Sequence, residues 1–94
     1  MIKGTGYLKK QNIRKWSYFS LFGTKEGKSE KEKLYYFGRY DKALKEMYEF
    51  RDTGKMPEEL KSLGFTLEDL DHWILTLETR TTRRGKEIII LTGE

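Results

Sequence analysis

The sequence predicts an α+β fold, in which a small antiparallel sheet of about five strands packs against one main helix and one or two short helices. Two aromatic-rich runs near the start of the chain predict strands, and the apolar residues that follow at spacings of three and four predict a helix. A β-branched run close to the C-terminus also favours a strand. The chain has 94 residues, no repeat and no linker-like segment, so we expect a single domain over residues 1–94.

The first three strands are expected within residues 6–40. We predict a strand over 6–10, a turn at Gln11-Asn12, a second strand over 14–24 and a third over 33–40. Strict alternation divides the second strand into two faces, with Trp16, Tyr18, Ser20 and Phe22 on one and Lys15, Ser17, Phe19 and Leu21 on the other. Neither face is wholly polar, so one aromatic face is either exposed or covered by the helices.

Helices are expected from residue 41 onward. Asp41 is the predicted N-cap of the main helix, because its carboxylate can accept a hydrogen bond from a free amide of the first turn. Gly54 suits the left-handed residue that ends this helix, and Pro57 fits the first turn of a short second one. Thr66 and Asp69 form a weaker relative of the capping box at the start of a third helical turn.

Residues 72–82 support two predictions. A helical stripe of apolar residues continues into this segment, whereas its β-branched residues favour a strand. The stripe consists of Leu67, Leu70, Trp73, Ile74 and Leu77. We favour a second hairpin, formed by residues 73–80 and 86–92. An exposed edge strand at 86–92 could pair with a second copy of the chain and form a homodimer.

Basic residues are concentrated in the predicted strands. The net charge is +4, divided as +7 over residues 1–40, −5 over 41–78 and +2 over 79–94. A positive sheet face indicates a polyanionic partner, such as nucleic acid or an anionic membrane, although solubilising charge accounts for +4 equally well. The chain has no cysteine, membrane span or signal-peptide core, so we exclude disulfides and thiolate metal sites and expect a soluble, cytoplasmic protein.

Catalytic residues, a metal site and a cofactor are not expected, so we predict that the protein is not an enzyme. The single histidine, His72, has no ligand-spacing motif around it. Two acidic clusters, Glu58-Glu59 and Glu68-Asp69-Asp71, stand where helices are predicted to start. Negative charge there complements the helix dipole, so we interpret both clusters as structural.

Two groups of residues are candidates for binding nucleic acid, with Lys and Arg contacting phosphates and Arg or Trp reaching base edges. The first group lies on the predicted sheet and comprises Lys9, Lys10, Arg14, Lys15, Trp16, Tyr18, Lys33 and Arg39. The second lies at the tip of the predicted C-terminal hairpin and comprises Arg80, Arg83, Arg84 and Lys86. The alternative interpretations are core aromatics with a solvated basic rim, and a simple solvated turn.

The first half of the chain combines a Gly start, a basic stretch with a Trp-containing second strand, a third strand with a Gly, and an Ala-bearing helix. These features stand at Gly6, Lys15–Phe19, Tyr36–Tyr40 and Asp41–Tyr48. Residues 6–50 thereby resemble the AP2-like DNA-binding fold and the related arm-binding domains of phage integrases. The resemblance implies a DNA-facing sheet that carries Arg14, Trp16, Tyr18 and Arg39.

A second resemblance rests on Gly6–Lys10, Lys15–Leu21 and Leu34–Phe37. These segments look like the start of a pleckstrin-homology domain. That family holds phosphoinositide phosphates with basic residues of its first two strands, which implies such a role for Lys9, Lys10 and Lys15.

Our leading hypothesis is a small non-enzymatic protein that binds nucleic acid, DNA rather than RNA, through a basic and aromatic sheet face. Compact basic chains without cysteine are common in phages and mobile elements. One alternative is a protein-binding module, for instance a phage-type inhibitor of a host enzyme, whose binding would be lost on Trp16→Ala or Trp73→Ala. A second alternative is a phosphoinositide- or membrane-binding module.

Overall fold

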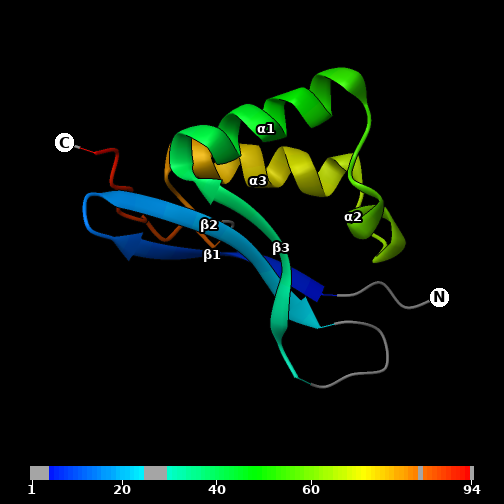
Figure 1. Ribbon diagram of the computed structural model, residues 1–94, viewed down its shortest axis with the longest axis horizontal. Coiled ribbons are helices and arrows are strands. Elements are labelled where there is room, and N and C mark those ends of the chain that lie inside the picture. The colour runs from blue at the N-terminus through cyan, green and yellow to red at the C-terminus, as the bar shows by residue number, and fades with distance from the viewer. Residues whose placement is uncertain (1–4, 25–29, 83, 94) are drawn as a thin grey trace.

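A meander of three antiparallel strands opens the fold, and helices pack on one side of it (Figure 1). The computed structural model describes residues 5–24, 30–82 and 84–93. The sheet has the order β1-β2-β3, with β1 (Thr5–Ile13), β2 (Trp16–Thr24) and β3 (Glu32–Arg39). The helices are α1 (Tyr40–Thr53), α2 (Glu58–Ser62) and α3 (Leu67–Thr79). The α+β class is confirmed, but the described residues form three strands rather than about five.

The β1–β2 hairpin is longer than expected. Its register runs without a shift from Thr5 opposite Thr24 to Ile13 opposite Trp16, which leaves residues 14–15 as the loop. The turn predicted at Gln11-Asn12 is therefore wrong, because both residues continue β1. The side chain of Asn12 accepts a hydrogen bond of 2.6 Å from the Ser17 hydroxyl across the hairpin instead of turning the chain. Arg14 supplies the left-handed conformation that a two-residue loop requires, with a φ of 58°.

The β2–β3 pairing contains two register shifts. They fall between Phe19 and Ser20 and between Leu21 and Phe22 of β2. The extra residues on β3 are Phe37 and Leu34, and both are buried. A bulge leaves its extra residue outside the ladder pairing, so the facing of the side chains along β3 departs from strict alternation at Phe37 and Leu34.

The core lies between the sheet and the helices. Phe19 and Leu21 of β2 are almost fully buried, at 1% and 0% exposure, and face the helices. The other members of the buried cluster are Leu34, Phe37, Ala43, Met47, Met56, Leu60, Phe65, Leu70, Trp73, Ile74, Leu77 and Ile90. The predicted alternation of β2 is thus correct, and the covered face is the one with Phe19. The face with Trp16, Tyr18 and Phe22 points away from the helices.

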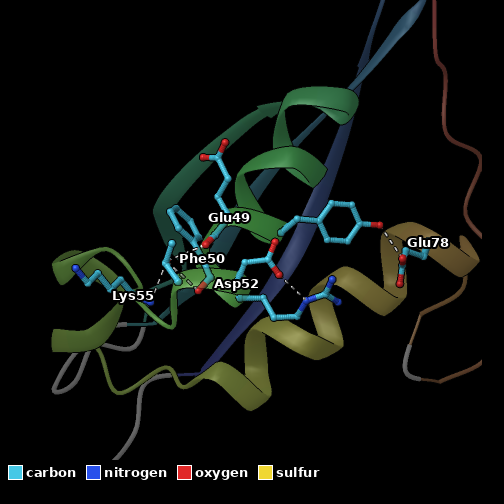
Figure 2. A network of polar contacts seen from close by, with 8 residues as sticks. Glu49, Phe50, Asp52, Lys55 and Glu78 are labelled. Carbon is cyan, nitrogen blue, oxygen red and sulfur yellow. Dashed lines mark hydrogen bonds and ion pairs between the residues drawn. The ribbon is translucent and has the colours of Figure 1, made fainter.

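The main helix forms as predicted, with one change at its start. Arg39 occupies the N-cap position, so Asp41 lies in the first turn and the prediction that it caps the helix is wrong. The Asp41 carboxylate instead accepts hydrogen bonds from the Arg39 guanidinium. Gly54 ends α1 in the left-handed conformation, with a φ of 70°. Near the middle of α1, the Tyr48 hydroxyl donates to Glu78 at 2.6 Å and ties α1 to α3 (Figure 2).

Residues 67–79 form a helix, so the predicted strand over 73–80 is wrong and the helical alternative is correct. The capping box is present: the Thr66 hydroxyl accepts from the Asp69 backbone N–H, and the Asp69 carboxylate accepts from the Thr66 backbone N–H. The apolar stripe buries Leu70, Trp73, Ile74 and Leu77. This burial and the cap outweigh the weak strand preference of the threonines and isoleucine.

The C-terminal run does not form the predicted strand over 86–92. Its described residues make two isolated bridges, Trp16 with Thr92 and Thr81 with Glu87. The Leu91 carbonyl accepts from the Ser17 N–H at 3.0 Å, and the Gly93 N–H donates to the Lys15 carbonyl at 2.8 Å. Residues 91–93 thus occupy the short length of β2 edge left when β3 turns into α1. The homodimer edge predicted at 86–92 does not exist as a strand.

Candidate functional site

The three helices lie on one side of the sheet (Figure 1). The opposite face of the sheet, called the outer face below, carries aromatic and basic side chains. Strand register arranges them in four rows across the sheet. The rows are Tyr7–Phe22–Lys33, Lys9–Ser20–Tyr36, Gln11–Tyr18–Arg39 and Ile13–Trp16. Each row contains at least one ring, and the first three each contain one cation.

Cations on this face lie over rings. The Lys9 ammonium is 4.5 Å from the ring centroid of Phe22, and the Lys33 ammonium is 5.3 Å from that of Tyr36. Lys31, just before β3, lies 5.2 Å from the ring of Tyr7. These distances are within the range of cation–π attraction. Positive charge and flat apolar surface are therefore interleaved rather than separated into patches.

Arg39 is the most constrained cation of the outer face. Its guanidinium carbon lies 3.9 Å from the ring centroid of Trp16. Its Nε and Nη2 donate to the two carboxylate oxygens of Asp41 at 2.8 and 2.9 Å. This paired contact raises the pKa of Arg39 and lowers the pKa of Asp41. Two of the guanidinium's donors are thus engaged within the protein.

The Trp16 ring is also bounded by the C-terminal segment. Gly93 has a φ of 93°, and a Cβ added there would lie 2.5 Å from Cζ2 of Trp16. The backbone of Gly93 therefore rests against the edge of the ring, while Arg39 covers its face. Trp16 is half-buried by these two neighbours.

The first predicted group is largely gathered in one place. The outer face holds Lys9, Trp16, Tyr18, Lys33 and Arg39. Arg14 and Lys15 are exposed at the hairpin loop, at one end of that face. Lys10 is the exception, because alternation turns it toward the helix side, where its ammonium donates to the Ile89 carbonyl at 2.5 Å.

The second predicted group lies around a short loop rather than at the tip of a two-stranded hairpin. Arg80 is the C-cap of α3, and its guanidinium lies 5.9 Å from the ring of Tyr40. The loop is closed by hydrogen bonds from Thr82 N–H to the Lys86 carbonyl and from Ile88 N–H to the Arg80 carbonyl. Arg84 and Lys86 are exposed on it, and Arg83 is outside the described residues.

Three rings of the outer face, Tyr7, Phe22 and Tyr36, were absent from the sequence-based candidates. Tyr7 and Phe22 share a row because the β1–β2 register is unbroken. Predicting the hairpin loop at residues 14–15 would have placed these two rings opposite each other. Tyr36 faces outward because of the bulges in β3, for which the sequence carries no signal we recognise. Tyr36 and Tyr7 are nevertheless well exposed, at 53% and 45%.

The polar groups outside the outer face include the single histidine. His72 is half-buried and lines an open pocket with Leu75 and four threonines, Thr76, Thr79, Thr81 and Thr82. Within residues 5–24, 30–82 and 84–93, no three His, Cys, Asp or Glu side chains come together in a way that could hold a metal ion. No helix in the described part of the chain has the length and apolar character needed to cross a membrane.

Comparison with known proteins found no matching family model, no matching curated protein and no matching solved structure.

Proposed function

We propose that this is a small non-enzymatic protein that binds nucleic acid through the outer face. The observation that carries the proposal is the interleaving of rings and cations on a sheet face that the helices leave exposed. The strand order followed by α1 is also the order implied by the resemblance to AP2-like and integrase arm-binding domains. That resemblance favours DNA over RNA.

The proposed phosphate contacts are made by lysine and arginine side chains other than Arg39, which is paired with the Asp41 carboxylate. Lys9 and Lys33 stand on the two flanking strands, and Arg14 and Lys15 extend the positive surface at the hairpin loop. Their long side chains reach phosphates without fixing a base sequence. Arg39 has a different role, because its contact with Asp41 holds it over Trp16. It orients the ring rather than reading a base.

The experiment is fluorescence anisotropy with labelled duplex DNA, single-stranded DNA and RNA between about 50 and 300 mM salt. The variant Lys9→Gln/Lys33→Gln should weaken binding and reduce the slope of log affinity against log salt by roughly 0.7 to 0.9 for each phosphate that the variant no longer neutralises. The matched control is Lys45→Gln/Lys55→Gln, which removes the same charge from exposed positions on α1 and just after it. The control should retain most of the slope.

Two results would contradict the proposal. The first is the absence of binding to any of the three nucleic acids at low salt. The second is an equal weakening in both double variants, which would mean that net charge alone governs binding and that the outer face has no special role.

A second candidate function is a protein-binding module, favoured by the exposed apolar side chains of the same face. Ile13, Tyr7 and Tyr36 are 47%, 45% and 53% exposed. Exposed aromatics commonly become binding hot spots in protein interfaces. Trp73 is no longer a candidate contact, because it is 7% exposed and packs against Phe37 in the core. Binding that resists salt and is abolished by Trp16→Ala would favour this function.

A further inference from the structure

The rings of the outer face recur at a fixed interval along the sheet. Same-face residues on a strand are two positions apart, and a strand rises about 3.3 Å per residue, so neighbouring rows lie about 6.6 Å apart. Following the rows along β2, the rings are Trp16, Tyr18, Tyr36 from the neighbouring strand, and Phe22 with Tyr7 beside it. Tyr36 fills the row in which β2 itself has only Ser20.

This interval does not match stacked bases. One strand of B-DNA advances about 3.4 Å per base pair, about half the spacing of the rows. A base cannot remain stacked on its neighbours in a duplex and also lie on a ring of every row. A single strand can splay its bases, because nothing pairs them.

Resting on the proposed function, we infer that the outer face binds single-stranded nucleic acid extended along β2, with bases stacked on its exposed rings. Tyr36 and Tyr7 are the first platforms, because they are the most exposed rings of the face. Trp16 is less available, since Arg39 covers its face and Gly93 its edge.

The cations are placed for the backbone of such a strand. Lys9 on β1 and Lys33 on β3 flank β2 on its two sides, each with its ammonium resting over a ring. A lysine side chain is flexible enough to leave the ring for a phosphate when a base takes its place. The rings then bind bases and the flanking lysines neutralise the phosphates.

The outer face is less suited to binding in a groove of duplex DNA. Reading guanine in the major groove commonly uses an arginine fork, and the fork of Arg39 already holds the Asp41 carboxylate. At the middle of β2, Ser20 is only 9% exposed, so its short side chain cannot reach the floor of a groove.

The test is anisotropy with unstructured labelled oligonucleotides of four, eight and twelve nucleotides, beside a hairpin duplex, all at the same salt. We expect single strands to bind more tightly than the duplex, although the duplex has the denser charge. Tyr36→Ala should weaken single-strand binding about five-fold or more, as expected when one base–ring stack is removed, with the salt slope unchanged. Tyr36→Phe keeps the ring and should bind like the original chain.

The outcomes separate this inference from the proposed function. Equal or tighter binding to the duplex, or equal affinities for Tyr36→Ala and Tyr36→Phe, would overturn the single-strand inference and leave nucleic-acid binding intact. No binding to any oligonucleotide would overturn the proposed function itself. Far-UV circular dichroism establishes that each variant is folded, and Tyr7→Ala repeats the test at an independent ring.

Discussion

Replacing Gly93 by alanine should detach the C-terminal segment from the sheet. The new Cβ would lie 2.5 Å from Cζ2 of Trp16, and the φ of 93° adds left-handed strain of roughly 1–2 kcal/mol. Undocking residues 91–93 relieves both the clash and the strain. It also breaks the two backbone hydrogen bonds to Ser17 and Lys15 and the hydrogen bond from the Leu91 N–H to the Ser17 hydroxyl, worth about 1 kcal/mol each. We therefore expect the free energy of unfolding to fall by about 3 kcal/mol.

Gly54→Ala is the matched control for this prediction. Gly54 is also left-handed, with a φ of 70°, but an added Cβ would meet nothing within 4 Å. Urea denaturation measures both variants, and acrylamide quenching of tryptophan fluorescence reports on Trp16, because Trp73 is buried. Quenching should rise in Gly93→Ala and stay constant in Gly54→Ala. Equal destabilisation with unchanged quenching in both would refute the contact between Gly93 and the ring.

Three further predictions concern helices and pH. Leu77→Ala should lower the free energy of unfolding, measured by urea denaturation, by about 2–5 kcal/mol, because Leu77 is buried. Leu75→Ala should lower it by less than about 0.5 kcal/mol, because Leu75 is 54% exposed. Similar losses in the two variants would indicate a strand, on which both residues share a face. Thr66→Ala should cost about 1 kcal/mol because the cap is removed, and an unchanged stability would contradict the capping box. Burial and the hydrogen bond to Glu46 raise the pKa of Tyr35. Its stabilising contribution is therefore complete below about pH 10, the ordinary pKa of a tyrosine, and is lost as the pH rises from there toward the raised pKa. Tyr35→Phe should flatten the decline in stability above about pH 10.

Local signals predicted most of the first two-thirds of the chain. The alternation along β2, the glycine that ends α1 and the Thr66 cap are properties of neighbouring residues, and all three were predicted correctly. The prediction of a strand over 73–80 was wrong, because it rested on the β-branched residues within the segment. The segment is helical because a helix buries Trp73 and Leu77 against other elements of the fold. The prediction of a strand over 86–92 was wrong for a related reason, because strand formation also depends on distant residues. Only a short length of the β2 edge was left for this segment to pair with.

The position of a candidate residue could be predicted where it depends only on alternation within one strand. Trp16 and Tyr18 share the outer face by alternation alone. The roles of Arg39 and Lys10 could not be predicted in this way, because they depend on a carboxylate in α1 and on a carbonyl near the end of the chain. Tyr36 points outward because of a bulge in β3. A bulge changes which face of the sheet a side chain lies on, and the amino-acid composition of the strand does not reveal it.

The two edges of the sheet differ in how readily they would accept another strand. The bulges of β3 interrupt its register, and an irregular edge is a poor template for self-association. β1 is regular over nine residues and, within the part of the chain that the structure describes, pairs with β2 alone, so it is the edge that a second copy would extend. Lys9 and Lys10 stand near its centre, where like charges repel an identical strand. Pairing of β1 with an identical strand would therefore bring together two copies of the same short basic sequence that begins the outer face.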